Sequence, residues 1–165
     1  MEKNGEICPV KVEGVKNVYY TLKTYLNALE ASNESLNEEK ALFIAPLDNL
    51  IWDRKMISEI FDFDYTWEIY KIPEKRQYGY YVLPILYNAR FVGRIDPKLD
   101  RINRTMIINS LLLEERSEKH FISELVAALK SFLRFHDVFQ IKIIKTEPQK
   151  LKNALLAELN HLASW

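Results

Sequence analysis

The chain has 165 residues, which is enough for one domain with a substantial core and short for two. Hydrophobic residues make up 48% of the sequence and include 8 Phe, 9 Tyr and 3 Trp, so the composition is globular and excludes a disordered chain. The 23 Lys and Arg residues balance 23 Asp and Glu residues, and the net charge of zero excludes the general basic field of many nucleic-acid-binding domains.

A local excess of positive charge lies near the middle of the sequence. The segment from Lys71 to Arg104 contains eight basic and three acidic residues, so it carries a charge of +5 and the rest of the chain carries −5. Within a neutral protein such a segment is a weaker sign of nucleic-acid binding than a basic domain, but it gives a candidate site a position.

The sequence is typical of a protein from a reducing compartment. Its single cysteine, Cys8, excludes an internal disulfide. The charged start at Met1–Asn4 is not followed by an apolar run, and no stretch approaches the roughly 18 consecutive apolar residues of a membrane span. We therefore expect a cytoplasmic protein with no signal peptide and no contact with a membrane.

Two short strands are predicted at the start of the chain. Apolar and charged residues alternate in Ile7–Leu22 on either side of a turn at Glu13–Gly14. Thr21 is expected to cap a short helix that contains Tyr25. The polar segment Ala31–Lys40 is the predicted linker.

A short buried strand is predicted at Leu42–Ile44, followed by a turn and a helix. Apolar residues recur at helical spacing after Asp53, which predicts an amphipathic helix over Arg54–Phe61 with Asp53 as its N-cap. We expect Asp48 to hold the preceding turn through backbone hydrogen bonds and Trp52 to fill the core.

Four segments rich in aromatic and β-branched residues predict further strands: Tyr65–Ile72, Gln77–Tyr87, Arg90–Asp96 and Asn103–Leu113. Asn88–Ala89 is the predicted hairpin turn between two of them, because Asn tolerates the left-handed conformation, and Asp100–Asn103 is a second turn. These strands form an antiparallel meander, either a curved open sheet or a small closed barrel.

The C-terminal part predicts a helix, a strand and a second helix. Ser117 can cap the first helix, whose apolar face holds Phe121, Leu125, Leu129 and Phe132. The strand covers Val138–Lys145. Thr146–Gln149 then fits a helix start, and a leucine stripe follows at 151, 155, 159 and 162. The stripe either covers the sheet or forms a dimer face. The fold class is α+β in one domain, 1–165, made of an N-terminal segment (1–35), a β-rich part (41–115) and a helix–strand–helix part (116–165).

Several of these stretches together resemble a known family. They are Pro46–Arg54, which includes Asp48-Asn49 and Trp52-Asp53-Arg54, then Phe63–Tyr65, Lys75–Pro84 and Gly93–Asp96. They are similar to the C-terminal half of the winged-helix family of bacterial crosslink-repair DNA glycosylases, and the resemblance extends from about Gly5 to Glu115. It implies a fold that includes a winged-helix-like part, and double-stranded DNA as the partner. It also implies that the family's N-terminal catalytic part is missing, in a short natural protein, a truncated gene product or a fragment.

Enzymes of this family carry a glutamine–x–glutamine or glutamine–x–aspartate motif that positions the attacking water. The glutamines of this chain are Gln77, Gln140 and Gln149, and none is followed two residues later by Gln or Asp. The resemblance therefore implies a DNA-binding or accessory module of DNA repair with no catalytic residue. Two alternatives stay open: a structural or protein-interaction module that pairs with a separate catalytic winged-helix protein, and a residual glycosylase or hydrolase that uses Asp48, Asp53, Asp64 or Asp96.

No metal or cofactor is expected. The three histidines lie far apart, without metal-ligand spacing to one another or to Cys8, and four glycines are too few for a phosphate-binding loop.

Seven basic residues are predicted to contact DNA phosphates: Arg54, Lys75, Arg76, Arg90, Arg94, Lys98 and Arg101. Alternation along the strand places Arg90 and Arg94 on one face with Asp96, and Gly93 allows a bulge or the close approach of another backbone. The alternative is a solvated ladder of ion pairs between Arg94 and Asp96 or Asp100.

The tyrosines at 78, 80 and 81 also leave two interpretations open. On a strand, Tyr78 and Tyr80 share one face and Tyr81 lies on the other. Beside Lys75 and Arg76 they suit base stacking, and on a sheet they suit core packing.

Overall fold

A computed structural model of the chain describes residues 5–28, 31, 40–114 and 120–159. It contains a two-stranded sheet, β1 (Ile7–Lys11) and β2 (Val18–Leu22), and a five-stranded sheet, β3 (Leu42–Phe43), β4 (Leu83–Tyr87), β5 (Arg90–Asp100), β6 (Thr105–Leu113) and β7 (Gln140–Glu147). The helices in the described part include α2 (Arg54–Phe61), α3 (Phe121–Phe135) and α4 (Lys150–Leu159), with 3-10 turns η2 (Lys23–Tyr25), η3 (Asn49–Ile51), η4 (Glu68–Tyr70) and η5 (Pro73–Lys75). The predicted α+β class is confirmed.

The large sheet is open rather than closed into a barrel. Its strand order is β3-β4-β5-β6-β7, so β3 and β7 are its edges. All neighbours are antiparallel except β6 and β7, which run parallel. The parallel pair follows from α3, which crosses over one face and returns the chain in the same direction. The predicted antiparallel meander is therefore correct from β4 to β6 and ends there.

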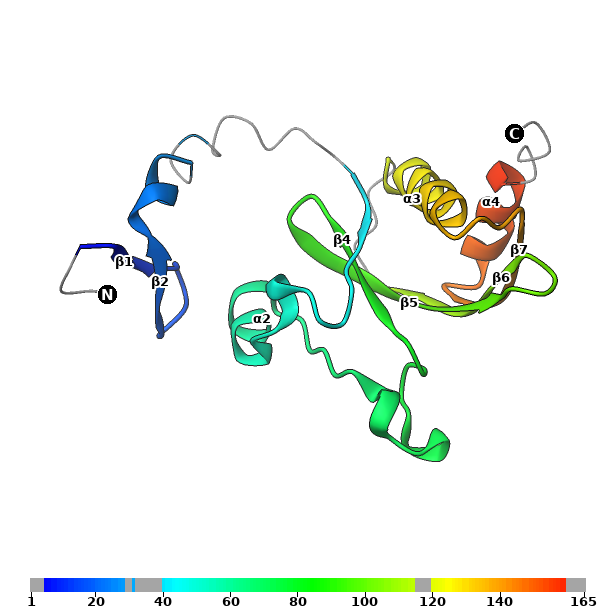
Figure 1. Cartoon of the computed structure of the whole chain (residues 1–165), viewed down its shortest axis with the longest axis horizontal. Helices are drawn as coiled ribbons and strands as arrows, with labels where there is room; N and C mark the ends of the chain where they lie inside the picture. The colour runs from blue at the N-terminus through cyan, green and yellow to red at the C-terminus, as the bar shows by residue number, and fades with distance from the viewer. Residues whose placement is uncertain (1–4, 29–30, 32–39, 115–119, 160–165) are drawn as a thin grey trace.

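The main core lies between one face of the sheet and the helices α3 and α4 (Figure 1). Leu83, Ile95 and Leu111 are direct neighbours across β4, β5 and β6, and each is at most 5% exposed. The predicted apolar face of α3 and the leucine stripe of α4 both cover this face, with Phe121 and Leu155 fully buried. Leu162 lies outside the described residues. The leucine stripe therefore covers the sheet, within the part of the chain that the structure describes.

A second, smaller core lies around α2. Phe63 stacks on Phe91 of β5 with ring centroids 4.7 Å apart, and Ile51 and Ile57 are fully buried beside them. Asp53 caps α2 as predicted, since its Oδ1 accepts hydrogen bonds from the backbone N–H groups of Lys55 (3.0 Å) and Met56 (3.1 Å).

The turn before α2 is also held as predicted, but the prediction for the nearby Trp52 is wrong. Asp48 Oδ1 accepts a hydrogen bond of 2.8 Å from the backbone N–H of Leu50. The prediction that Trp52 fills the core is wrong, because its side chain is 68% exposed and Ile51 takes the buried position instead.

The predicted strand over Tyr65–Ile72 does not form, and Gln77–Tyr87 is a strand only from Leu83. Residues 67–82, which we call the Glu68 loop, contain two 3-10 turns instead. The reason is Glu68, whose buried carboxylate accepts hydrogen bonds from the backbone N–H groups of residues 77–79 and removes them from any strand ladder.

The predicted strands at the N-terminus are confirmed as the hairpin β1–β2. Thr21 does not cap a helix, because it lies within β2 and the N-cap of η2 is Leu22. Most of the predicted linker and the predicted cap Ser117 lie outside the described residues. Thr146 does not act as an N-cap that accepts hydrogen bonds from backbone N–H groups. Its hydroxyl instead donates to the carbonyl oxygens of Pro148 (3.1 Å) and Gln149 (3.2 Å) at the start of α4.

The hairpin turn between β4 and β5 forms where it was predicted. Asn88 and Ala89 have φ values of 48° and 56°, and the register of the two strands shifts by one residue between Ile85 and Leu86. Gly93 lies next to this bulge, and a Cβ at Gly93 would overlap the carbonyl oxygen of Leu112 on β6. The predicted close approach of another backbone at Gly93 is confirmed.

We expect Gly93→Ala to lower the free energy of unfolding by about 3 kcal/mol, because the paired strands on both sides leave the clashing backbone no room to move. Urea unfolding followed by circular dichroism measures this loss. Gly14→Ala is the control, since Gly14 has a φ of 79° but no atom within 4 Å of an added Cβ. That variant should lose only about 1 kcal/mol of backbone strain, and equal losses at the two sites would contradict the clash.

Candidate nucleic-acid interface

The sheet face opposite α3 and α4, which we call the outer face, changes in character along β5. Near the β4–β5 turn it is covered by the second core, and in the middle it is covered by the Glu68 loop. In the view of Figure 1 the two helices lie above the sheet and this loop lies below it. The remaining end of the outer face, formed by the last part of β5 with β6 and β7, is open.

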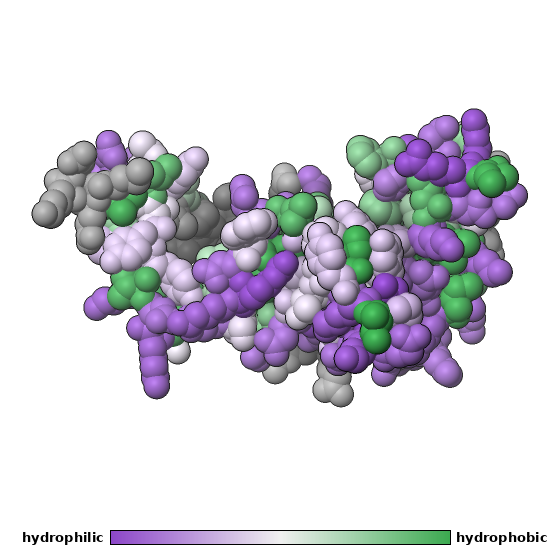
Figure 2. Space-filling model, turned by 60° about the horizontal axis from the view of Figure 1, so that its bottom comes forward, coloured by the Kyte–Doolittle hydropathy of each residue, from purple (hydrophilic) through white to green (hydrophobic). Residues whose placement is uncertain are grey.

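Three lysines lie on this open end, and we call them the outer-face lysines. The register places Lys98 of β5 opposite Ile107 of β6, and Ile107 opposite Lys142 of β7. Ser110 of β6 is likewise opposite Lys145 of β7. All three lysines are exposed. Figure 2 brings this side forward and shows mostly hydrophilic side chains, with single apolar ones between them, over its right-hand half.

The carboxylates near these lysines are mostly engaged elsewhere. Asp96 is 6% exposed, and its Oδ1 and Oδ2 accept hydrogen bonds from Tyr81 N (3.0 Å) and Asn109 Nδ2 (3.2 Å). Asp100 accepts two hydrogen bonds from Asn103, which lower the pKa of Asp100. Within the described part of the chain Lys98 and Lys142 form no salt bridge, and the Lys145–Glu147 pair is long (3.7 Å) and exposed, so it is weak.

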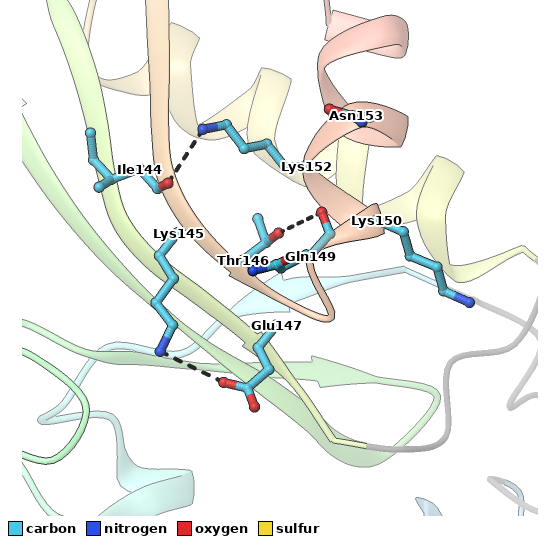
Figure 3. Close-up of a pocket in the computed structure, with 8 residues that line it drawn as sticks. All are labelled: Ile144, Lys145, Thr146, Glu147, Gln149, Lys150, Lys152 and Asn153. Atoms are coloured by element: carbon cyan, nitrogen blue, oxygen red, sulfur yellow. Dashed lines mark hydrogen bonds and ion pairs between the residues drawn. The ribbon is translucent and has the colours of Figure 1, made fainter.

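A shallow pocket of about 820 Å³ continues the basic surface past the edge of β7 (Figure 3). Lys145, Lys150 and Lys152 line it, together with Glu147 and the polar side chain of Gln149. Lys152 Nζ donates to the carbonyl oxygen of Ile144 (3.3 Å), and Lys150 points away from the pocket into solvent. The pocket therefore has more positive than negative groups at its rim.

The Glu68 loop borders the outer face through direct hydrogen bonds. Ser110 Oγ donates to the carbonyl oxygen of Tyr78 (3.2 Å), next to Lys145 in the register. Gly79 has a φ of 151°, and a Cβ there would overlap the Asp96 side chain, so only glycine fits at this contact. The loop thus lies beside the outer-face lysines and brings its own cations, Lys75 and Arg76, to the same side.

The carboxylate of Glu68 fixes the shape of the loop. It is 1% exposed and accepts hydrogen bonds from Gln77 N (3.0 Å), Tyr78 N (2.7 Å) and Gly79 N (3.3 Å), and Lys71 Nζ lies 2.9 Å away. Burial opposes ionisation, but these donors outweigh it and lower the pKa of Glu68 to about 2. The carboxylate is therefore charged at neutral pH and holds both ends of the loop.

Two of the seven predicted phosphate contacts are engaged inside the protein. Arg94 is 7% exposed and donates to Glu114 Oε1 (2.5 Å) and to the carbonyl oxygen of Asp64 (2.6 Å). Its guanidinium also lies 4.2 Å and 4.3 Å from the ring centroids of Phe63 and Tyr78. Neither the predicted exposure of Arg94 nor the alternative solvated ladder with Asp96 or Asp100 is correct, because the Glu68 loop covers this part of β5.

Arg54 has a similar internal role. Its guanidinium donates to the carbonyl oxygens of Ile51 and Pro46 and lies 4.6 Å from the ring centroid of Tyr65. Burial lowers the pKa of Arg54, although the side chain stays charged at neutral pH. Arg54 therefore braces the start of α2 against the second core.

The other five predicted residues are at the surface but not in one patch. Arg90 pairs with Tyr87, whose ring meets Phe121 of α3, so Arg90 lies on the helix-covered side at the β4–β5 turn. Lys98 lies on the outer face, about 25 Å farther along the strand. The predicted common face of Arg90 with Arg94 and Asp96 is therefore wrong, because the bulge next to Gly93 reverses the alternation.

Arg101, Lys75 and Arg76 lie at the margins of the outer face. Arg101 is exposed in the β5–β6 turn. Partial burial lowers the pKa of His136 at the end of α3, and the positive charge of Arg101 lowers it further. Lys75 is exposed in η5, and Arg76 Nε donates to the carbonyl oxygen of Lys71 (2.9 Å). Of the predicted set, the structure thus brings Lys98, Lys75 and Arg76 to one side of the molecule.

The tyrosines of the loop are not packed in the sheet core. Tyr80 is 51% exposed and its ring lies 4.8 Å from the Arg76 guanidinium, and Tyr81 is 40% exposed. Tyr78 is half-buried against Arg94. The prediction of shared and opposite strand faces fails here because this segment is not a strand.

Sequence reasoning missed Lys142 and Lys145. The alternation in Val138–Lys145 predicts a strand with its lysines in solvent, but it does not reveal which strand is the neighbour. The pairing of β7 with β6 places these lysines beside Lys98. The sequence did contain an indication of this pairing, because a helix between two strands is typical of a crossover that joins parallel neighbours.

Comparison with known families agrees with the residues that suggested DNA repair. The model of the family described as DNA glycosylase AlkZ-like matches residues 1–135. The chain belongs to this AlkZ-like family. No solved structure matches the chain. Membership relates the chain to DNA repair. The match includes the second core, the Glu68 loop and Lys98, and it ends with α3, before the part of the main core that β7 and α4 supply and before Lys142 and Lys145.

The described residues lack both a metal-binding cluster and a membrane-spanning helix. They contain no group of three or more His, Cys, Asp and Glu side chains that could hold a metal ion. None of the helices in this part of the chain is long and apolar enough to cross a membrane.

We expect Glu68→Gln to lower the free energy of unfolding at pH 7 by about 2–4 kcal/mol, since three backbone donors lose a charged buried acceptor. The folded-state pKa of about 2 lies below the ordinary 4.5, so the carboxylate stabilises fully above about pH 4.5 and loses this effect as the pH falls toward 2. The difference between wild type and variant should therefore shrink from pH 5 to pH 3 in urea unfolding.

The matched control is Glu74→Gln on the same loop, where the side chain is exposed. It should change the stability by less than about 0.5 kcal/mol at every pH. A difference between Glu68→Gln and wild type that stays constant down to pH 3 would show that the carboxylate is not the acceptor that holds the loop.

Proposed function

We propose that this chain is a DNA-binding module of a repair protein, corresponding to the C-terminal half of the AlkZ-like glycosylases and not catalytic on its own. The supporting observation is the open end of the outer face. There the outer-face lysines and the loop cations Lys75 and Arg76 gather on one side of a protein whose net charge is zero. Such a surface suits the phosphate backbone of double-stranded DNA.

The aromatic side chains beside these cations support the same function. Tyr80 is half-exposed next to Arg76, and Tyr70 and Ile72 project from the same loop. Proteins that bind unpaired or distorted DNA usually combine cations, which contact the phosphates, with exposed aromatic rings, which stack on the bases. The surface of this loop therefore adds contacts to bases that the lysines alone do not provide.

The carboxylates favour a module without chemistry of its own. Asp48 and Asp53 accept backbone hydrogen bonds at helix starts, and Asp96 is buried under the Glu68 loop. Asp64 accepts a hydrogen bond from Arg94 through its backbone carbonyl, and its carboxylate is exposed. Together with the missing glutamine motif, this supports a binding role over a residual hydrolase with these residues.

A titration of duplex DNA at several salt concentrations tests the binding role. We expect the logarithm of the affinity to fall with the logarithm of the salt concentration, and this slope to decrease by about 0.9 for each phosphate contact removed. The test variant removes three charges at once and is measured by fluorescence anisotropy on a labelled duplex of 20 base pairs. Its substitutions are Lys98→Gln, Lys142→Gln and Lys145→Gln.

The control variant removes the same charge from other surfaces of the protein. Its substitutions are Lys11→Gln, Lys16→Gln and Arg90→Gln, all at exposed positions away from the outer face. We expect this variant to keep the wild-type slope. Equal losses for both variants would mean that net charge and not this face attracts DNA, and no binding by the wild type at low salt would refute the function.

A protein partner is the second candidate function, and the N-terminal hairpin favours it. Val18, Tyr20 and Leu22 are 43–56% exposed and share one face with Ile7 and Pro9. The opposite face is the one that meets α2, since Tyr19 and Asn17 bond the Glu59 carboxylate at 2.5–2.6 Å. A two-stranded sheet is marginal alone, and its apolar face suits a separate catalytic winged-helix part of the family.

Size-exclusion chromatography with light scattering tests this pairing against a purified N-terminal part of an AlkZ-like glycosylase. We expect a 1:1 complex with the wild type and none with the double variant Tyr20→Ser, Leu22→Ser, because the polar replacements remove the apolar contact. The Lys98, Lys142, Lys145 variant should keep the complex. Wild-type protein that stays separate at micromolar concentration would contradict this function.

A further inference from the structure

The tip of the Glu68 loop carries two apolar side chains in solvent. Tyr70 is 87% exposed and Ile72 is 56% exposed, and they are separated by Lys71 alone. Neither is needed for the core, since the two hydrophobic cores are complete without them. Single exposed apolar side chains are common, but two of them close together at the tip of a folded loop form a small apolar patch that suits contact with another molecule.

The loop holds these side chains in a fixed place. Glu68 joins its two ends through hydrogen bonds to residues 77–79, and Arg76 Nε bonds the carbonyl of Lys71 next to the tip. The Trp67 ring meets the rings of Tyr70 and Tyr81 edge-on at 5.8 Å and 6.0 Å. A side chain that is already positioned loses little entropy on binding, so the tip suits insertion into a partner.

The surroundings of the tip favour DNA as this partner. Lys75 and Arg76 follow it, and Glu74 is the one exposed carboxylate between Trp67 and Val82. At its other end the loop bonds Ser110, the neighbour of Lys145, so the tip projects from the same side as the outer-face lysines. DNA bound along those lysines would lie next to the loop, which is below the sheet in Figure 1.

We propose that Tyr70, with Ile72, enters the base stack of duplex DNA bound on the outer face. Apolar and aromatic side chains that wedge into a base step must unstack it, and this costs least where pairing is already broken. The ligand class is therefore duplex DNA with a weakened step, such as an abasic position or a mismatch. This inference rests on the proposed DNA-binding function.

The test compares two duplexes of equal length and sequence, one intact and one with a single abasic analogue beside 2-aminopurine. We expect the wild type to bind the abasic duplex about tenfold more tightly, the size of one base–aromatic stack. The fluorescence of 2-aminopurine should fall on binding, because the Tyr70 ring enters the empty position beside it and stacks on it. The double variant Tyr70→Ala, Ile72→Ala should bind both duplexes with the wild-type affinity for intact DNA, without the fall.

Two single variants serve as controls. Tyr70→Phe keeps the ring and should keep the preference. Phe135→Ala removes another aromatic side chain that is 82% exposed, at the end of α3, and should change nothing. Circular dichroism verifies that each variant is folded.

The outcomes separate this inference from the function on which it rests. Salt-dependent binding of intact duplex without a preference for the abasic one would overturn the wedge and leave the DNA-binding module. A preference that survives Tyr70→Ala, Ile72→Ala would also overturn it. Wild-type protein that binds neither duplex at low salt would refute both.

Discussion

The buried side chain of Arg94 connects three parts of the chain to the centre of β5. Its guanidinium lies between the rings of Phe63, from the second core, and Tyr78, from the Glu68 loop. It also donates to Glu114 just beyond β6 and to the carbonyl of Asp64. Removing a cation from water costs several kcal/mol, so it stays buried only while these partners surround it. The position of the loop beside the sheet, and thus the border of the outer face, depends on this cation.

The residues that carry the family resemblance turn out to form this same framework. Asp53 caps α2 and Arg54 braces it, and Gly79 makes room for the Asp96 side chain where the loop meets β5. Arg94 then closes the contact. Such a set of residues fixes the fold tightly, because their side chains are engaged with other parts of the protein. Membership in the AlkZ-like family, which rests on a match that includes these residues, therefore says much about the scaffold and little about catalysis.

The predictable part of the fold is the part that local rules determine. Asp53 as a cap, the turn at Asn88–Ala89 and the helix over the sheet all follow from capping, backbone conformation and periodicity. The Glu68 loop could not be predicted, because its aromatic composition is that of a strand and one buried carboxylate overrides it. The prediction that Arg94 is exposed was wrong for a related reason. Alternation along a strand shows which residues share a face, but it does not show whether a distant loop covers that face. The outer-face lysines required the pairing of β7 with β6, which is a long-range property.

The neutral charge of the chain and a DNA-binding face are compatible because electrostatic forces are short-ranged in physiological salt. At about 0.15 M the screening length is about 8 Å, so a phosphate responds to the lysines next to it and not to carboxylates across the molecule. On the outer face the competing acids Asp96 and Asp100 are already bonded to the protein's own donors, and Glu68 is buried. Folding therefore converts a sequence with no net charge into a surface on which the exposed cations outnumber the available carboxylates.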